Sequence, residues 1–205
     1  MTELPIVALD VETDGLAPWR HVWEVAMIKR WPDGHVKRRH YFIRDAVNLA
    51  RLPDLTGLRV GGYFERHPQG VRGPSVGAHE AERILSACAS FRPAAYVAEK
   101  VMDFTFDAYL VGANVAFDAA SLERLLRGHE CAPGWHYRLI DVETYAAGKF
   151  GWPYPRGLRG TAEQLDIDVD GTKTHTAMYD AELAMRVYDA VYHHVPAELV
   201  EEAVS

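Results

Sequence analysis

The sequence has little cysteine and no long apolar run, and both absences narrow what it can encode. Only Cys88 and Cys131 are present among 205 residues, too few for a disulfide framework or a four-cysteine zinc site. No stretch is long and apolar enough to predict a membrane span, and the N-terminus lacks the basic-then-apolar pattern of a signal peptide. We therefore expect a cytoplasmic protein that makes no contact with a membrane.

An overall excess of positive charge is also missing. The net charge is -7, which does not favour a general nucleic-acid coat protein. The region 37–92 is an exception, because it holds ten basic and five acidic residues. Two interpretations are open for this region: a local surface that contacts phosphates, or a solvated arginine-rich face.

The composition is otherwise that of an ordinary globular protein, with 48% hydrophobic and 25% charged residues. The length predicts a single domain over residues 1–205. Residues 45–76 are rich in glycine and proline, and we interpret them as a long irregular insertion. Such an insertion could serve as a lid, as a surface that guides a strand, or as a docking loop for a partner.

The pattern of apolar residues predicts strands that are later joined by helices. Three β-prone runs at 4–11, 21–31 and 35–44 begin the chain, and the turn at Pro32-Asp33-Gly34 makes the last two a hairpin. Further strands are predicted at 108–112 and 137–142, and helices at 78–91, 94–106, 117–127, 143–149, 161–166 and 177–194. This order predicts an α/β sandwich.

The first motif places two carboxylates at the end of a buried strand. Asp10 and Glu12 follow an apolar run, and because side chains alternate along a strand both face the same side. Buried like charges repel each other unless a cation lies between them, so the pair indicates a metal site. A solvated strand end before the turn at Thr13-Asp14-Gly15 is the alternative.

Two further motifs are each unspecific alone. Asn114 precedes a predicted helix and Asp118 lies in its first turn, where the helix dipole commonly favours acids. His175 and Asp180 would lie about 140° apart on one helix, so we place His175 on the preceding loop, with Thr174 or Thr176 as the cap. The acid could hold a metal and the neutral imidazole could accept a proton near neutral pH. A surface histidine is the alternative.

In this order the three motifs resemble those of a known family. Residues 10–16, 110–118 and 175–180 are similar to the motifs of the DnaQ-like 3′–5′ exonucleases, which carry four acids and a histidine and belong to the ribonuclease H-like superfamily. The resemblance covers nearly the whole chain apart from 45–76 and the C-terminal tail. It implies an α/β fold with a mixed five-stranded sheet flanked by helices.

The resemblance also implies the roles of individual residues. Two divalent ions, Mg²⁺ or Mn²⁺, would be held by the oxygen ligands that they prefer, on the acids Asp10, Glu12, Asp118 and Asp180. His175 would be the general base that deprotonates the attacking water. The substrate would be contacted by Thr13, Leu16, Asn114 and Phe117. Leu16 would act as an apolar wedge, whereas Phe117 fits a core position equally well.

Two positions depart from the family pattern. Asp14 stands where the family more often has a small hydroxyl residue, and an additional acid beside the substrate would weaken phosphate binding. Ala113 replaces a residue that is often histidine or glycine.

We therefore expect an enzyme that releases nucleoside monophosphates from the 3′ end of single-stranded DNA by two-metal hydrolysis. The resemblance also implies a role in proofreading or DNA repair and a polymerase or replication partner. The motifs do not separate DNA from RNA, so an exoribonuclease on short RNA is one alternative. A non-catalytic nucleic-acid-binding or polymerase-associated module is another. A small-molecule phosphatase fits the acids but not the order of the motifs.

Overall fold

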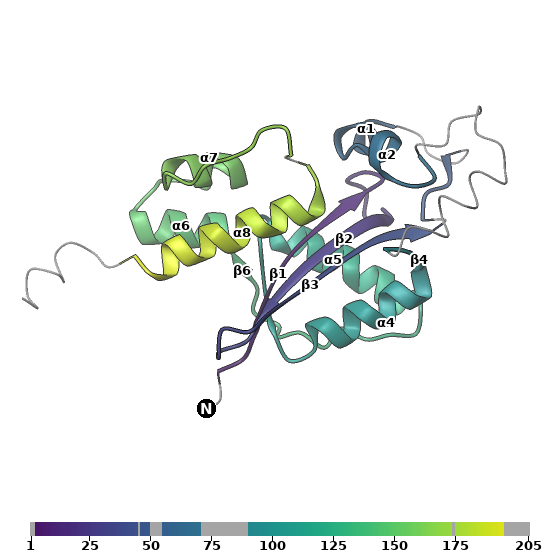
Figure 1. The fold of residues 1–205 in the computed structure, drawn as a ribbon, viewed down its shortest axis with the longest axis horizontal. Coiled ribbons are helices and arrows are strands. Elements are labelled where there is room, and N and C mark those ends of the chain that lie inside the picture. The colour runs from purple at the N-terminus through teal and green to yellow at the C-terminus, as the bar shows by residue number, and fades with distance from the viewer. Residues whose placement is uncertain (1–2, 45, 50–54, 71–89, 174, 195–205) are drawn as a thin grey trace, which may run out of the picture.

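A computed structural model of the chain describes residues 3–44, 46–49, 55–70, 90–173 and 175–194. Its centre is a six-stranded mixed sheet in the order β4-β3-β2-β1-β5-β6 (Figure 1). The strands are β1 (Ile6–Thr13), β2 (Val22–Arg30), β3 (Val36–Arg44), β4 (Phe91–Pro93), β5 (Tyr109–Gly112) and β6 (Ile140–Asp141). β1 pairs antiparallel with β2 and parallel with β5, so it lies in the interior of the sheet.

The predicted fold class is confirmed, although the sheet has one strand more than the five predicted. The additional strand is β4, which pairs parallel with β3 at the edge of the sheet. It contains three residues and ends at Pro93. A run this short has no alternating pattern that a sequence could reveal, and proline is tolerated at such an edge.

Helices cover both faces of the sheet (Figure 1). One face is covered by α4 (Ala94–Thr105) and α5 (Val115–Arg127), and the other by α6 (Val142–Phe150), α7 (Gly157–Gln164) and α8 (Ala177–Tyr192). No helix in the described ranges is long and apolar enough to cross a membrane.

The side chains of β1 divide between these two faces as the strand alternation requires. Val7, Leu9 and Val11 are buried against α4 and α5. Ala8 faces the other way and packs against α8, whose buried face is also rich in alanine. Small residues on both elements allow α8 to lie close to the strand, and this closeness later brings the start of α8 to the end of β1.

Most predicted elements are confirmed with shifted ends. α5 begins two residues earlier than predicted and α7 begins at Gly157 rather than 161, whereas the predicted strand 137–142 is reduced to the two residues of β6. Of the predicted helix 78–91, residues up to 89 lie outside the described part of the chain, and Phe91 belongs to β4.

The described residues of the predicted irregular insertion include two short helices, α1 (Thr56–Val60) and α2 (Tyr63–Arg66). They are anchored to the sheet by Trp23 of β2, which is fully buried with Leu58 and Tyr63. The Trp23 and Tyr63 rings meet edge to face, with centroids 5.3 Å apart. Positions 45, 50–54 and 71–76 of the insertion lie outside the described residues, and the single-domain organisation stays a prediction.

Candidate active site

Three carboxylates converge where β1 ends. Asp10 and Glu12 point to the same face of the sheet as Ala8, toward α8, and Asp180 lies in the first turn of that helix. One oxygen atom from each of the three carboxylates lies within 4.8 Å of the others. The structure therefore brings together acids from opposite ends of the chain.

The fourth predicted acid reaches the same place from the opposite face of the sheet. Asp118 on α5 is only 4% exposed, and its Oδ1 accepts a hydrogen bond of 3.0 Å from the backbone N–H of Val11. Asp118 does not belong to the group of three converging carboxylates. It lines the same pocket of about 260 Å³, which also includes Leu16, Asn114, Phe117 and His175.

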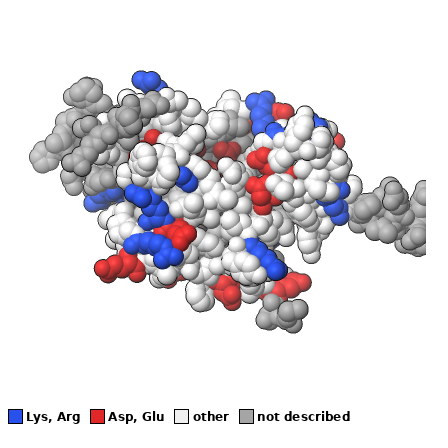
Figure 2. All heavy atoms as spheres, turned by 180° about the vertical axis from the view of Figure 1, so that it is seen from behind, with Lys and Arg blue, Asp and Glu red and all other residues white. Residues whose placement is uncertain are grey.

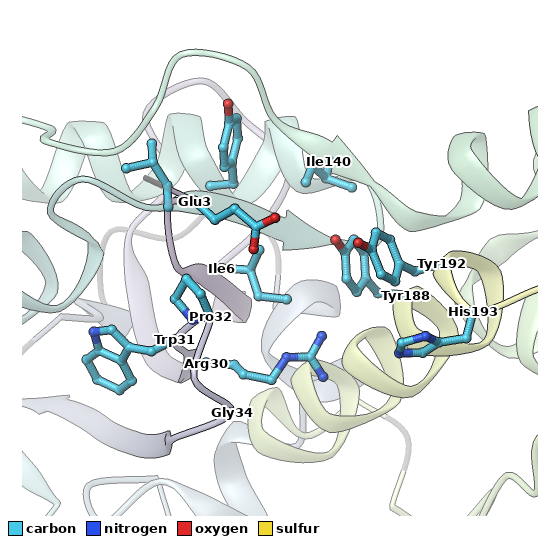
Figure 3. Close-up of a pocket in the computed structure, with 12 residues that line it drawn as sticks. Glu3, Ile6, Arg30, Trp31, Pro32, Gly34, Ile140, Tyr188, Tyr192 and His193 are labelled. Carbon is cyan, nitrogen blue, oxygen red and sulfur yellow. The ribbon is translucent and has the colours of Figure 1, made fainter. Parts of the chain in front are cut away.

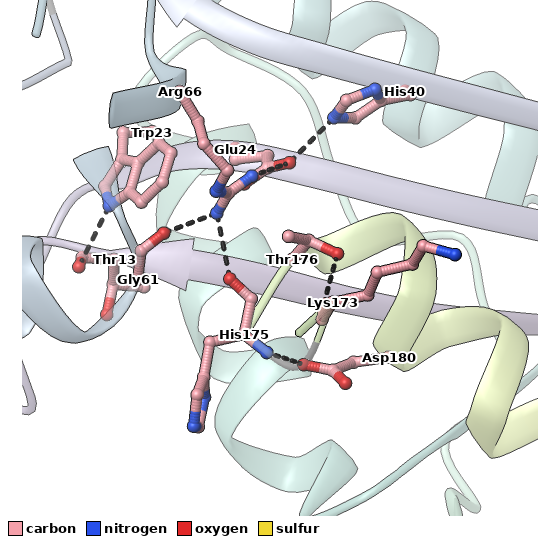
Figure 4. A network of polar contacts seen from close by, with 10 residues as sticks. All are labelled: Thr13, Trp23, Glu24, His40, Gly61, Arg66, Lys173, His175, Thr176 and Asp180. Carbon is pink, nitrogen blue, oxygen red and sulfur yellow. Dashed lines mark hydrogen bonds and ion pairs between the residues drawn. The ribbon is translucent and has the colours of Figure 1, made fainter. Parts of the chain in front are cut away.

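The loop that carries His175 is held at both of its backbone polar groups. The His175 N–H donates to Oδ2 of Asp180 at 2.9 Å, and its carbonyl accepts from the guanidinium of Arg66 at 3.0 Å (Figure 4). The residue has a φ of 63°, in the left-handed region that non-glycine residues rarely adopt. Its side chain is exposed at the pocket.

This arrangement agrees with the comparisons to known proteins. Residues 79–188 match the family RNase_T, which is described as an exonuclease. The chain belongs to this family. The match confirms both the resemblance that the motifs indicated and the assignment to the exonucleases. No curated protein matches the chain.

The fold of this exonuclease domain is similar to that of E. coli exonuclease I. The structure of that protein with a dT13 oligonucleotide gives a TM-score of 0.64 at 15% identity, over 93% of this chain and 41% of the other. The complex with dA16 gives 0.65 at 15% identity, over 95% and 42%. A zinc-bound complex with single-stranded DNA gives 0.64 at 17% identity, over 93% and 40%. The chain thus spans about two fifths of the length of exonuclease I.

In the exonuclease domain, burial and mutual repulsion favour the protonated form of these acids over the ionised form. Burial, followed by the charges of Asp118 and Glu12, raises the pKa of Asp10 well above its usual value. Burial and the charge of Glu24 raise the pKa of Glu12 to about 8. Burial raises the pKa of Asp118 to about 8 and also raises that of Asp180.

A divalent cation fits this donor set. The members of this exonuclease fold family use divalent metals, and the site offers carboxylate oxygens, which Mg²⁺ and Mn²⁺ prefer. A cation among Asp10, Glu12 and Asp180 would replace their mutual repulsion with attraction. The structure therefore supports a divalent metal at this place without identifying the element.

A fifth acid, Glu24, lies directly opposite Glu12 in the β1–β2 register and is 1% exposed. Like charges at such a position destabilise a sheet, but Glu24 is paired with Arg66 at 2.7 Å and with His40 at 2.8 Å (Figure 4). Arg66 also donates to the carbonyl of Gly61. The expectations from the sequence did not include this network, although an acid within the apolar run 22–28 is a signal that a buried charge needs a partner.

The loop after β1 is closed by Asp14, which is not among the residues that line the pocket. Its carboxylate accepts hydrogen bonds of 2.7 Å from both the backbone N–H and Nδ1 of His21, and the residue is 8% exposed. The Asp14 carboxylate is thus turned to His21, and its effect on phosphate binding stays a prediction. Thr13 is also buried, and its hydroxyl donates to the carbonyl of Gly15. The structure therefore does not bring the Thr13 side chain into the pocket.

Asn114 and Phe117 lie at the pocket, but neither has a single simple role. Asn114 occupies the N-cap position of α5 with a φ of 49°, and its side chain makes no capping hydrogen bond. Phe117 packs partly against the core, and the guanidinium of Arg20 lies 3.7 Å from the centre of its ring. Thr176 is the N-cap residue of α8, but its hydroxyl donates to the carbonyl of Lys173, and Thr174 lies outside the described residues.

A larger cavity of about 960 Å³ lies at the opposite end of β1 (Figure 3). It is lined by Glu3, Ile6, Arg30, Tyr188 and Tyr192 among others. Glu3 is the one acid among its described lining residues. This larger cavity has no converging carboxylates among its described lining residues, so the smaller pocket is the one that suits the chemistry of an exonuclease.

The raised pKa values predict a stability that depends on pH and metal. Between about pH 4 and 8 the folded acids bind more protons than the unfolded ones, so stability falls as pH rises. In EDTA we expect a lower melting temperature at about pH 9 than at about pH 6. Each kcal/mol of lost unfolding free energy lowers the melting temperature of a protein of this size by about 2–4 °C. Mn²⁺ should restore stability mainly at the higher pH, and Asp118→Asn should flatten the profile. A melting curve that is independent of both pH and Mn²⁺ would contradict this electrostatic account.

A second prediction concerns the contact between α1 and Glu12. A Cβ atom at Gly61 would lie 2.5 Å from Oε2 of Glu12 and 2.9 Å from the Trp23 ring. Gly61→Ala should therefore displace the carboxylate and weaken Mn²⁺ binding in calorimetry by at least about tenfold. Gly148→Ala is the matched control, because its added Cβ meets no atom within 4 Å. Equal Mn²⁺ affinities of the two variants would show that Gly61 does not shape the site.

Proposed function

We propose that this domain is a metal-dependent 3′–5′ exonuclease that releases nucleoside monophosphates from the 3′ end of single-stranded DNA. The convergence of Asp10, Glu12 and Asp180 within 4.8 Å, in a pocket shared with Asp118 and His175, carries the proposal. The similarity to exonuclease I complexes with dT13 and dA16 supports the choice of single-stranded DNA.

In this proposal the four acids hold two divalent ions, Mg²⁺ or Mn²⁺. Asp10, Glu12 and Asp180 would provide one site, and Asp118 would contribute to the second beside Asp10. When bound, the ions supply positive charge that activates water and stabilises the charge developing on the phosphate. The carboxylates contribute by holding that charge at a fixed point of the sheet.

His175 is the general base of the proposed reaction. Its ring takes a proton from the attacking water as the new oxygen–phosphorus bond forms. The bond between phosphorus and the 3′ oxygen then breaks, and this oxygen takes a proton from solvent. The backbone contacts to Asp180 and Arg66 keep the imidazole at the pocket throughout.

The remaining pocket residues would position the terminal nucleotide. Leu16 is 85% exposed at the pocket, as an apolar wedge between bases requires. Phe117 offers a ring for a base, and Asn114 offers an amide for the phosphate. The buried Thr13 would act by shaping the loop, since its side chain is turned to Gly15. A role in proofreading or repair, a polymerase partner and a cytoplasmic location stay predictions from the resemblance.

The direct test offers end-labelled single-stranded DNA and RNA with Mg²⁺ or Mn²⁺. We expect DNA to shorten from its 3′ end with release of monophosphates, and Asp10→Asn or Asp180→Asn to lower kcat by at least about 10²-fold. Asp103→Asn is the control, because Asp103 is exposed on α4 with only a surface ion pair. Shortening of RNA alone would establish the exoribonuclease alternative, and no shortening of either strand would refute the nuclease.

The role of the histidine can be separated from the metal site. His175→Asn should lower kcat by about 10²- to 10⁴-fold at neutral pH while Mn²⁺ affinity is retained, because the ring accepts a proton and the acids hold the metal. His193→Asn, at an exposed position beyond α8, is the control. A His175→Asn enzyme with full kcat would exclude this residue as the base.

A further inference from the structure

A groove of about 730 Å³ lies beside the candidate active site, between α5 and the sheet. Its polar lining includes Arg20, His21, Ser121, Arg124, Arg127 and His129. None of the described residues that line it is acidic. In a chain of net charge -7 this is a local concentration of positive charge. Such a groove is suited to a polyanion.

One face of α5 connects the active-site pocket to this groove. The residues of that face that line the pocket are Asn114, Phe117 and Asp118, and those that line the groove are Ser121, Arg124, Leu125 and Gly128. Their spacing of three and four residues places them in a stripe along the helix. From Asp118 to Gly128 the stripe extends about 15 Å.

Arg20 joins the two cavities. Its guanidinium lies over the ring of Phe117, which lines the pocket, and donates to the Phe117 carbonyl at 3.0 Å. It also donates to the hydroxyl of Ser121, which lines the groove, at 2.7 Å. Through these contacts Arg20 links a residue that lines the pocket to a residue that lines the groove.

Two arginines of the groove are available to bind phosphate. Arg124 is exposed and has no ion-pair partner within the part of the chain that the structure describes. Arg127 pairs with Glu123 at 2.7 Å, but the two side chains are 64% and 45% exposed, and such surface pairs contribute little. A phosphodiester could therefore replace solvent at Arg124 and compete for Arg127.

An exposed tryptophan lies in the loop between β1 and β2. Trp19 is 64% exposed, and in the sequence it lies between Leu16, which lines the pocket, and Arg20, which lines the groove. A turn closed by the hydrogen bond from Arg20 N to Ala17 O fixes this part of the loop. Sites for single-stranded nucleic acid combine such aromatic rings with a basic groove that follows the backbone.

We propose that the groove binds the phosphodiester backbone of the substrate strand on the 5′ side of the nucleotide being removed, with Trp19 stacked on a base at its entrance. Seen from behind, acidic side chains lie in a hollow near the middle of the surface, and a group of basic side chains with acidic ones among them lies to its lower left (Figure 2). The inference rests on the proposed function, and it adds the path by which a strand longer than its terminal nucleotide is held.

The test compares R124A/R127A with the matched variant R159A/R186A. Each double variant removes one exposed helical arginine with a glutamate partner at i±4 and one without an ion pair among the described residues. Binding of fluorescent dT20 is measured by anisotropy in EDTA, where no hydrolysis occurs. Hydrolysis of dT20 and of the p-nitrophenyl ester of thymidine 5′-monophosphate is then measured with Mn²⁺, and melting curves check the fold.

R124A/R127A should weaken dT20 binding and raise its KM about tenfold, with unchanged kcat and unchanged KM for the small ester. The slope of log affinity against log salt should fall by about 1.4, which is about 0.7 for each lost contact on a single strand. R124K/R127K should restore most of the affinity, and R159A/R186A should match wild type. Equal affinities and salt slopes for the two alanine variants would overturn the groove.

These readouts separate the two proposals. If wild type hydrolyses neither substrate, the proposed function fails, yet the anisotropy difference between the two double variants still decides the groove. If it hydrolyses both and R124A/R127A binds dT20 as wild type does, only the groove fails.

Trp19→Ala should weaken dT20 binding by at least about fivefold and Trp19→Phe much less. Unchanged binding by Trp19→Ala would remove the stacking contact.

Discussion

The end of β1 concentrates more carboxylates than can all stay ionised there without a partner. Asp10, Glu12 and Asp180 converge there, Asp118 lines the same pocket, and Glu24 lies opposite Glu12 on the neighbouring strand. Within the described chain only Glu24 among these five acids is paired with an arginine, Arg66, and it also contacts His40. The other four rely on protons or on a cation, since burial without either is costly. The unfavourable electrostatics of these acids therefore favours a cation at this end of the strand.

The packing of the domain brings these acids together. The alanine-rich contact between α8 and the sheet sets Asp180 close to Asp10 and Glu12. The opposite face has larger side chains, and from there Asp118 reaches the backbone of Val11 at the same strand end. α1 completes the enclosure, because Gly61 leaves room for the Glu12 carboxylate. Residue size thus acts on the site as directly as residue charge does.

Much of this could be predicted from local pattern, and the rest depends on contacts between distant segments. That Asp10 and Glu12 face the same side of one strand is a local property, because they are two residues apart. The loop position of His175 likewise follows from its spacing to Asp180. The Glu24–Arg66 pair joins β2 to a short helix whose pattern is obscured by glycine, so no local signal identifies the partner. The orientation of Asp14 toward His21 likewise depends on how the loop closes, and the three-residue β4 has too few residues for a pattern.

The contacts of Arg66 also explain how a surface loop can hold the proposed base in place. A left-handed φ at His175 is unfavourable for a residue with a Cβ, so it persists only where neighbouring groups impose it. Asp180 holds the His175 N–H and Arg66 holds its carbonyl, while Arg66 is itself fixed by Glu24 and Gly61. The cation that neutralises the fifth buried acid is thus the group that fixes the backbone of the proposed base. One arginine from the insertion thereby links the charge balance of the sheet to the position of the proposed base.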